Sequence, residues 1–321
     1  MKWFWNILSA TLVIVGLAGS CSQIKDSLED CPQELVFKFY RQTGCDTQRY
    51  YPADFKDVKV FVFDGNDVLV DIVEDNDITL TEDYALKAVF RSGGDFTFVT
   101  WAAQDMEDYA VSGIKKGEST KSDLLLAFKH EDGMALTRPS TLYFSDKRDA
   151  LAREAIAPGD GTLVDTVYFN MKEYTYRINL QVQGLDPARK YSLYLMDDND
   201  RYDVAGEIFP SATFNYITPD QGQDGDAIVG LFTELKLEEG RNATLAVWDD
   251  TSDELVYTAN LVEDLILYKR FGIRSPYNLD CHHDFNIIIA LRLDTESATY
   301  MAVRAVINDW NLVYRDVGGI Q

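Results

Sequence analysis

The sequence predicts an all-β protein built from two consecutive β-sandwiches. Short segments rich in Val, Ile, Phe and Tyr follow one another along the chain, and Gly, Asp, Asn and Pro separate them. Several segments alternate apolar with polar residues, the period of two that is typical of a strand with one buried face. There is neither a long heptad run nor a regular alternation of strands with helices. The length of 321 residues suits two domains, each with a core of its own.

The first 20 residues are predicted to be a signal peptide for export. Lys2 precedes residues 3–20, which carry no charge and end in the small residues Ala-Gly-Ser that a signal peptidase requires. A cysteine follows directly, at the place where a bacterial lipoprotein carries its acyl chains. We therefore expect cleavage between Ser20 and Cys21, lipid attachment at Cys21, and a polar lipidated tether over residues 21–33.

Two alternatives to lipidation follow from the same stretch. A lipobox usually has Leu three places before the cysteine, whereas Ala18 occupies that position here and Leu17 lies one place earlier. Secretion without a lipid is therefore one alternative. The apolar run is also just long enough for a membrane-spanning helix, which needs about 20 residues. A retained signal anchor is the other alternative.

The composition limits which classes of partner this protein can bind and which reactions it could catalyse. The chain has 30 Lys and Arg against 53 Asp and Glu, a formal net charge of −23. Phosphate binding needs concentrated basic side chains, so nucleic acid and acidic lipid headgroups are disfavoured as partners. Only three histidines are present, at His130, His282 and His283, which leaves little material for acid–base chemistry near neutral pH.

Residues 34–157 are predicted to form the N-terminal β-sandwich. The predicted strands are residues 35–40, 58–63, 68–73 and 96–101. Asp64–Asp67 is a turn signal, which makes residues 58–73 a hairpin. Residues 123–128 suit either a strand or a helical turn, and residues 146–156, rich in good helix formers, predict a short helix.

The stretch Ala157–Gly161, which contains Pro and two Gly, predicts the domain boundary. The C-terminal β-sandwich then covers residues 162–321. Its clearest strand is Tyr174–Gln183, in which apolar and polar residues alternate for ten positions. Further predicted strands are residues 191–195, 227–232, 243–248, 254–259 and 285–293. Residues 300–314 predict one long final β segment.

The cysteines leave the disulfide connectivity open. With Cys21 lipidated, Cys31, Cys45 and Cys281 remain, an odd number for an exported chain. A Cys31–Cys45 disulfide would close a short loop around the first predicted strand. Cys281 is an equally acceptable partner for either of the other two.

No segment carries a catalytic or metal-binding motif. His282 and His283 are adjacent, so in an extended strand they point to opposite faces and a polar turn explains them better than a metal site. The acidic segments 197–200 and 220–226 lack the EF-hand spacing. We predict no metal, no cofactor and no enzymatic activity. Trp101, Trp248 and Trp310 lie in or beside apolar strand patterns, which favours core packing over stacking on sugar rings.

Several segments together resemble one known family, the fimbrillin-A-associated anchor proteins. In the first half these segments are Cys21–Pro32, Val58–Gly65 and Phe96–Ala102. In the second half they are Tyr176–Leu185, Tyr202–Asp203, Gly206 and Asn308–Trp310. The resemblance covers nearly the whole mature chain, although it consists of strand patterns rather than of catalytic residues.

The resemblance implies a fold and a role that composition alone does not show. Members are outer-membrane lipoproteins with two transthyretin-like β-sandwiches that hold the base of a fimbria and limit its length. Their polymerising relatives join when one subunit donates a strand into a groove of its neighbour, and cleavage at an Arg or Lys after the first strand opens those relatives. Arg41 and Arg49 occupy that neighbourhood here and are the candidate processing sites.

We therefore expect a lipid-anchored protein exposed on the outer membrane, a fimbrial anchor or accessory subunit that joins a pilin by β-strand exchange. Pilin subunits are the expected partners, and a host or bacterial surface ligand is compatible with this role. The alternatives are a surface glycan-binding lipoprotein, which would use aromatics such as Trp101 or Trp248, and a processed stalk or tip subunit. A metal-dependent enzyme using His282 and His283 is the weakest alternative.

Overall fold

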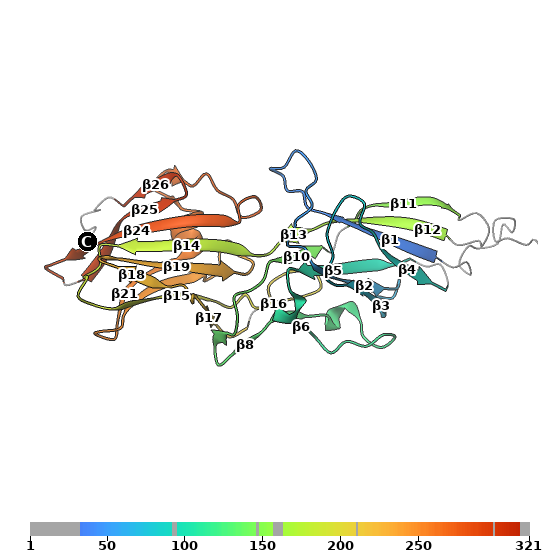
Figure 1. Ribbon diagram of the computed structural model, residues 1–321, viewed down its shortest axis with the longest axis horizontal. Coiled ribbons are helices and arrows are strands. Elements are labelled where there is room, and N and C mark those ends of the chain that lie inside the picture. Colours follow the sequence, from blue (N-terminus) through green and yellow to red (C-terminus); the bar gives the residue numbers. More distant parts are fainter. Residues whose placement is uncertain are drawn as a thin grey trace, which may run out of the picture.

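Two β-sandwiches lie end to end along the long axis of the molecule (Figure 1). This computed structural model describes residues 33–91, 95–145, 148–156, 163–209, 211–297 and 299–314. The predicted signal peptide, Cys21 and Cys31 lie outside the described residues. The prediction of an all-β fold is confirmed, because strands dominate and the described helices are short.

The first sandwich consists of a four-stranded and a five-stranded sheet. The order of the four-stranded sheet is β11 (Arg148–Ile156), β12 (Leu163–Asn170), β1 (Gln33–Tyr40) and β4 (Leu86–Phe90). The order of the five-stranded sheet is β13 (Lys172–Glu173), β10 (Leu142–Ser145), β5 (Thr97–Ala103), β2 (Asp57–Phe63) and β3 (Leu69–Asp75). Buried aromatic rings of both sheets meet between them, among them Phe37, Phe98 and Phe169.

The second sandwich consists of two six-stranded sheets. The order of one sheet is β18 (Gly222–Asp224), β19 (Ala227–Glu234), β14 (Tyr176–Gln183), β24 (Asp284–Asp294), β25 (Thr299–Ile307) and β26 (Trp310–Val313). The order of the other is β21 (Glu254–Asn260), β20 (Thr244–Asp249), β15 (Tyr191–Asp197), β17 (Phe214–Tyr216), β9 (Met134–Ala135) and β8 (His130–Glu131). A one-turn helix, η4 (Leu261–Ile266), follows β21.

Strand β14 shows why the alternating sequence predicts the second sandwich well. Ile178, Leu180 and Val182 are fully buried, whereas the residues between them face outward. Gly184 directly follows the strand, and its φ of +85° suits glycine. A Cβ at this position would collide with the backbone of Leu291, so the close approach of the two strands requires glycine as well.

The two sandwiches exchange short segments at their junction. Hairpin β8–β9, from the N-terminal half, extends the second sandwich, where Met134 pairs with Asn215 of β17. In return, β16 (Arg201–Tyr202) adds to β6 (Tyr109–Val111) and β7 (Leu126–Phe128) of the first half. The ring of Trp101 lies between both halves, 4.4 Å from the ring centre of Phe144 and 5.5 Å from that of Tyr202. The junction is therefore a continuous hydrophobic core.

Most of the predicted strands are present within a few residues of their predicted bounds. The predicted hairpin is β2–β3, and Asp67 in its turn has the positive φ of +60° that such turns require. The ambiguous segment 123–128 contains both alternatives, because the 3₁₀ turn η3 (Lys121–Asp123) leads into β7. The final segment is not one strand: Asn308 and Asp309 form a turn between β25 and β26.

Two predictions about the middle of the chain are wrong. Residues 148–156 form strand β11 rather than a helix, since pairing with β12 overrides helix propensity. The break at residues 157–161 is not a domain boundary, because it separates two neighbouring strands of the first sandwich. Strand β12 pairs in parallel with β1 along its whole length, so the first sandwich extends to β13 and the second begins at β14.

Candidate partner-binding surfaces

Strand β1, which follows the predicted tether, is an inner strand of the four-stranded sheet. It lies inside its sheet, parallel to β12 on one side and antiparallel to β4 on the other. Leu35, Phe37 and Phe39 point into the core, and the Phe39 ring stacks on Phe169 with centres 5.6 Å apart. Burial of each side chain contributes about 1.5–3 kcal/mol. The groove between β4 and β12 is thus filled by the chain's own strand.

The two candidate processing arginines follow β1 and differ in exposure. Arg41 is 14% exposed in its side chain and forms an ion pair of 3.4 Å with Glu173. Arg49 is exposed, and its guanidinium lies 4.1 Å from the ring centre of Tyr40. The backbones of Arg41 and Tyr50 exchange two hydrogen bonds, at 2.8 and 2.9 Å. This pairing restrains the backbone on either side of the loop, whereas residues 44–50, which include Arg49, are exposed.

The disulfide differs from the pairing that closes the shortest loop. Cys45 is bonded to Cys281, 236 residues later in the sequence, and not to Cys31. The bond joins the loop after β1, in the first sandwich, to the loop before β24, in the second. A cross-link over so long a stretch restricts the unfolded chain strongly, and native disulfides typically contribute about 2–5 kcal/mol. It also fixes the end of β1 to the C-terminal half.

Cys45 lies between the two arginines, and this position decides what cleavage would release. A cut after Arg41 would leave the preceding segment held only by the packing of β1. A cut after Arg49 would leave it bonded to the body through Cys45 and Cys281. The two candidate sites therefore have opposite consequences for a lipidated N-terminus.

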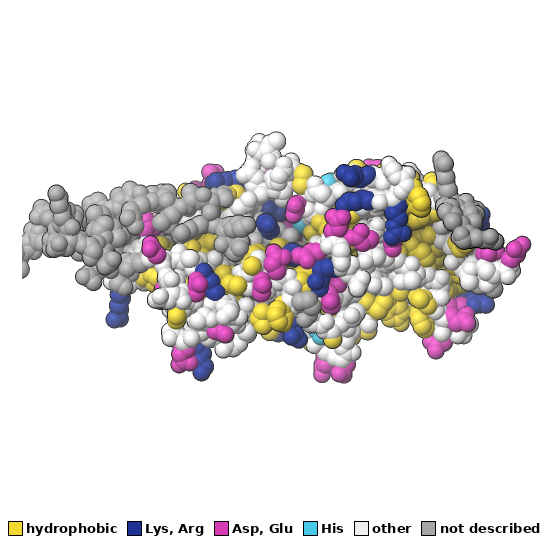
Figure 2. Space-filling view, turned by 180° about the vertical axis from the view of Figure 1, so that it is seen from behind, with side chains coloured by type: hydrophobic (Ala, Val, Ile, Leu, Met, Phe, Trp, Pro, Cys, Tyr) yellow, Lys and Arg dark blue, Asp and Glu magenta, His cyan; other side chains and the backbone are white. Residues whose placement is uncertain are grey.

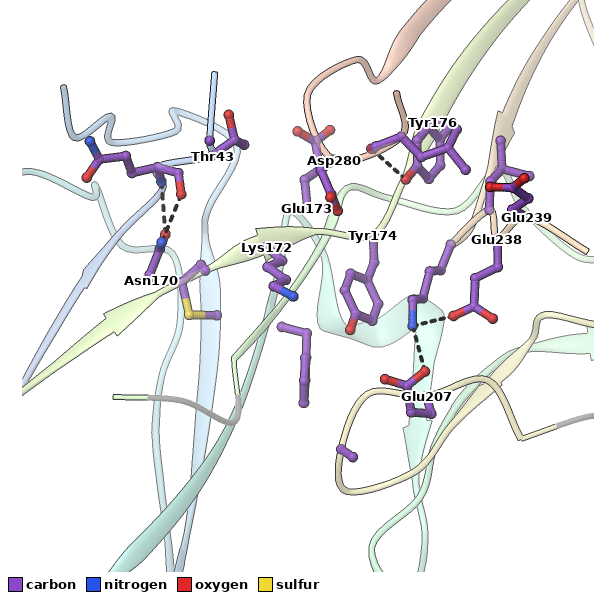
Figure 3. A pocket seen from close by; sticks show the side chains of 18 residues that line it. Thr43, Asn170, Lys172, Glu173, Tyr174, Tyr176, Glu207, Glu238, Glu239 and Asp280 are labelled. Atoms are coloured by element: carbon purple, nitrogen blue, oxygen red, sulfur yellow. Dashed lines mark hydrogen bonds and ion pairs between the residues drawn. The ribbon is translucent and has the colours of Figure 1, made fainter. Parts of the chain in front are cut away.

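A cleft of about 760 Å³ lies between the sandwiches (Figure 3). Edge strand β13 lines one side of the cleft, and the loops that carry Glu207, Glu238 and Asp280 line the other. Tyr176 lines it as well and donates a hydrogen bond of 2.9 Å to the carbonyl oxygen of Leu279. The cleft thus combines a short open sheet edge with aromatic and acidic side chains.

Lys236 neutralises part of the acidity of this cleft. Its Nζ lies 2.6 Å from Glu238 and 3.4 Å from Glu207, and it approaches the ring centre of Tyr174 at 5.0 Å. The two carboxylates therefore lie on either side of one ammonium group (Figure 3). No sequence pattern marked these residues, because Glu207 comes from a different loop than Lys236 and Glu238.

Two buried carboxyl groups beside this junction, those of Asp197 and Glu234, form no ion pair with any described residue. Burial raises the pKa of Asp197 to about 7, and burial together with the nearby Asp197 raises the pKa of Glu234 well above its usual range. Neither carboxyl oxygen of Glu234 has a hydrogen-bond partner among the described residues. These two groups make the junction sensitive to pH.

The acidic segment 197–200 is occupied by contacts within the protein. Tyr216 donates a hydrogen bond of 2.5 Å to Asn199, and Nε2 of His130 lies at hydrogen-bonding distance, 3.1 Å, from Asp200, a contact between the two halves. In the other acidic segment, Asp220 pairs with Arg138. Within the described ranges, no group of three or more acidic, His or Cys side chains is placed to hold a metal ion.

The adjacent histidines have separate environments. His283 is buried, stacks on Tyr176 and has Nδ1 3.0 Å from the carbonyl oxygen of Thr175; burial lowers its pKa. His282 instead contacts the edge of Tyr277. Since the two rings have different neighbours, they form no common ligand set.

The tryptophans also separate into two classes. Trp101 is completely buried and is excluded as a sugar-stacking residue. Trp248 lies on the outer side of β20, paired across the sheet with the exposed Leu255, and donates a hydrogen bond of 3.1 Å to Asp253. Hydrophobic side chains do gather on the C-terminal half of one face (Figure 2).

Comparison with known proteins identifies the family. The family model described as fimbrillin-A associated anchor proteins Mfa1 and Mfa2 matches residues 28–316. This chain belongs to that anchor family. The assignment confirms the resemblance found in the sequence.

One member of this anchor family matches this chain both in sequence and in solved structure. The minor fimbrium anchoring subunit Mfa2 of Porphyromonas gingivalis is 27% identical over 308 residues, which cover 94% of this chain and 93% of that protein. The solved structure of the fimbrial anchor protein Mfa2 from Porphyromonas gingivalis has a TM-score of 0.75 at 26% identity and covers 89% of this chain and 100% of that chain. This relative is a fimbrial anchor and not an enzyme.

A more distant relative shares the fold. A Bacteroides thetaiotaomicron structure described as a polysaccharide-binding protein has a TM-score of 0.72 at 22% identity and covers 88% of this chain and 99% of that chain.

Among the described residues, no helix has the length and apolar character needed to cross a membrane.

The position of Cys45 predicts a specific cleavage pattern. A recognition sequence for a site-specific protease, inserted after Arg49, should give a cut chain that runs intact on a non-reducing gel and separates only after reduction. The same insertion between Thr43 and Gly44 is the matched control and should separate under both conditions. Separation of the first variant without reductant would show that the Cys45–Cys281 bond is not formed.

The buried carboxyl groups predict a pH dependence of stability. Because the folded-state pKa values are raised, the folded chain holds protons that the unfolded chain releases, and stability falls as pH rises from about 4 through 7. Asp197→Asn combined with Glu234→Gln should remove about 1–4 kcal/mol of this loss between pH 5 and pH 8. Denaturant unfolding at both pH values measures it. The titration of His283 is present in both wild type and the double variant and therefore cancels in the comparison. If the free energy of unfolding changes equally with pH in the two proteins, Asp197 and Glu234 are not the source of the loss.

Proposed function

We propose that this chain is a non-catalytic fimbrial subunit of the anchor type, held in the outer membrane by a lipid on Cys21. Membership of the anchor family over residues 28–316 carries the proposal. The nearly full-length similarity to a fimbrium anchoring subunit supports it. Cys21, directly after the predicted signal peptide, would supply the attachment.

The fold suits a protein that transmits force from a tether. A load applied at residues 21–32 enters the body through β1, which is hydrogen-bonded on both sides and buried. The load then divides between the sheet and the Cys45–Cys281 bond, which leads directly to the second sandwich. The first strand is therefore secured by both packing and a covalent bond.

We propose that a pilin pairs with this chain by β-strand exchange at an open sheet edge, while β1 stays in place. Main-chain groups at an open edge can pair with an added strand, and neighbouring pockets select its side chains. The groove between β4 and β12 is filled, and displacing β1 would expose Leu35, Phe37 and Phe39. Exchange at another edge avoids that loss.

The alternatives have weaker support. A processed stalk or tip subunit would require cleavage at Arg41, which is largely buried, or at Arg49, where the Cys45–Cys281 bond would still hold the preceding segment. A glycan-binding role would rest on Trp248, which lies on an outward sheet face rather than in the cleft. Binding of this chain to a soluble polysaccharide, lost on Trp248→Ala, would favour the second alternative.

The anchoring role predicts a mature N-terminus at Cys21 that carries acyl mass. Cys21→Ala should release the protein from the membrane fraction and separate fimbriae from the cell, while the purified protein still copurifies with pilin. Intact mass, membrane fractionation and copurification measure the three effects. Cys31→Ala is the matched control for loss of a cysteine. An unacylated wild-type chain would contradict the tether, and a wild-type chain that does not copurify with pilin would contradict the subunit role.

Retention of β1 predicts that a locked first strand still binds pilin. Val36 of β1 lies opposite Lys87 of β4, and Val36→Cys combined with Lys87→Cys would join the two strands. Copurification with pilin should be unchanged in the oxidised double variant, with Lys87→Cys alone as control. If binding is lost on oxidation and returns on reduction, β1 is displaced when the pilin binds.

A further inference from the structure

A short hairpin beyond η4 projects a basic and aromatic tip from this acidic chain. Strands β22 (Lys269–Arg270) and β23 (Ile273–Arg274) flank a turn of Phe271 and Gly272, and all six residues are exposed. Phe271 is 82% exposed, more than any other large apolar side chain in the described part of the protein. It therefore contributes nothing to the hydrophobic core.

The backbone at the tip is unfavourable for the residue that occupies it. Phe271 has a φ of +55° and Gly272 a φ of +76°. Glycine and asparagine adopt this left-handed region readily, whereas a bulky side chain rarely does. An exposed aromatic residue in a strained turn stabilises neither the turn nor the core. Strained residues of this kind are concentrated at binding sites.

The positive charges on the hairpin also disfavour the folded hairpin. Lys269 lies directly opposite Arg274, and like charges in this position destabilise a hairpin. Lys269 pairs with Glu239 and Arg270 with Asp264, whereas Arg274 forms no ion pair with any described residue. The tip thus keeps a positive charge on a chain whose formal net charge is −23.

The base of the hairpin is held firmly. Helix η4 buries Leu261, Val262, Leu265 and Ile266. Tyr268 is buried beside the rings of Trp310 and Tyr314, and the backbone N–H of Ser275 donates a hydrogen bond of 3.0 Å to the carbonyl oxygen of Tyr268. A rigid base keeps a projecting tip ready to bind, which lowers the entropy lost on association.

We propose that Lys269–Arg274 is a docking tip for an acidic protein surface with a pocket for Phe271, and that the pilin supplies this surface. Aromatic and arginine side chains dominate the binding energy of protein interfaces, and a convex tip fits a partner's pocket. Glycan sites are concave, so the shape disfavours a sugar. The assignment to the pilin rests on the proposed anchoring function and adds a second contact to strand exchange.

The position of the tip argues against a membrane surface as its partner. The hairpin belongs to the second sandwich, whereas the tether enters at the start of β1, at the far end of the first sandwich (Figure 1). The tip therefore belongs to the half of the protein that does not carry the tether, which favours a protein partner over the membrane.

The test measures binding of purified pilin to the full mature chain over a range of salt concentrations. Phe271→Asn should weaken binding about tenfold, the effect of one interface anchor, and leave the melting temperature unchanged or raised. Arg274→Glu should weaken binding more at low salt than at high salt. The controls are Leu255→Asn, another exposed apolar residue, and Lys115→Glu, another exposed cation; both should bind like wild type.

The other outcomes separate the two proposals. Wild-type binding that persists in Phe271→Asn and Arg274→Glu would overturn the docking tip and leave the anchoring function intact. A wild-type chain that does not bind pilin would overturn the proposed function and this assignment with it. Binding of wild type to phosphatidylglycerol vesicles that is lost in Phe271→Asn would replace the protein partner by a membrane.

Discussion

The pairing of β1 with β4 and β12 is the interaction on which the rest of the structure depends. These pairings place the strand that follows the predicted tether inside a sheet, with its aromatic side chains at the centre of the first core. Strand β12 comes more than 120 positions later in the sequence, so the first sandwich closes only when distant parts of the chain meet. The same pairing fills the space between β4 and β12 and would give the proposed tether a firm attachment.

The junction extends this constraint to the second sandwich. Segments of each half add strands to the other, and Trp101 packs against rings from both. The Cys45–Cys281 bond lies at the same junction and connects the end of β1 with the start of β24. Because packing, strand pairing and a covalent bond coincide there, the two sandwiches are suited to transmit a load as one body.

The sequence predicted what depends on local pattern and missed what depends on distant pairing. Strand β14 was evident because its side chains alternate, and β2–β3 because a turn signal lies between two apolar runs. The helix assigned to residues 146–156 failed because strand pairing outweighed propensity. The boundary at 157–161 failed because a Pro-Gly break looks alike inside a domain and between domains. The Cys45–Cys281 bond has no local signal at all.

Residues that destabilise the fold point to a role other than folding, and whether they are buried or exposed indicates which role. Glu234 and Asp197 are enclosed at the junction, so a partner cannot reach them, and their effect is on stability as pH changes. Phe271 and Arg274 are equally unfavourable for folding but are fully presented to solvent on a firmly held base. Burial separates a group that senses protons from one that can contact another protein. The net charge of −23 disfavoured nucleic acid and acidic lipids as partners but did not reveal the basic tip. A sum over the whole chain hides a local cluster of the opposite sign.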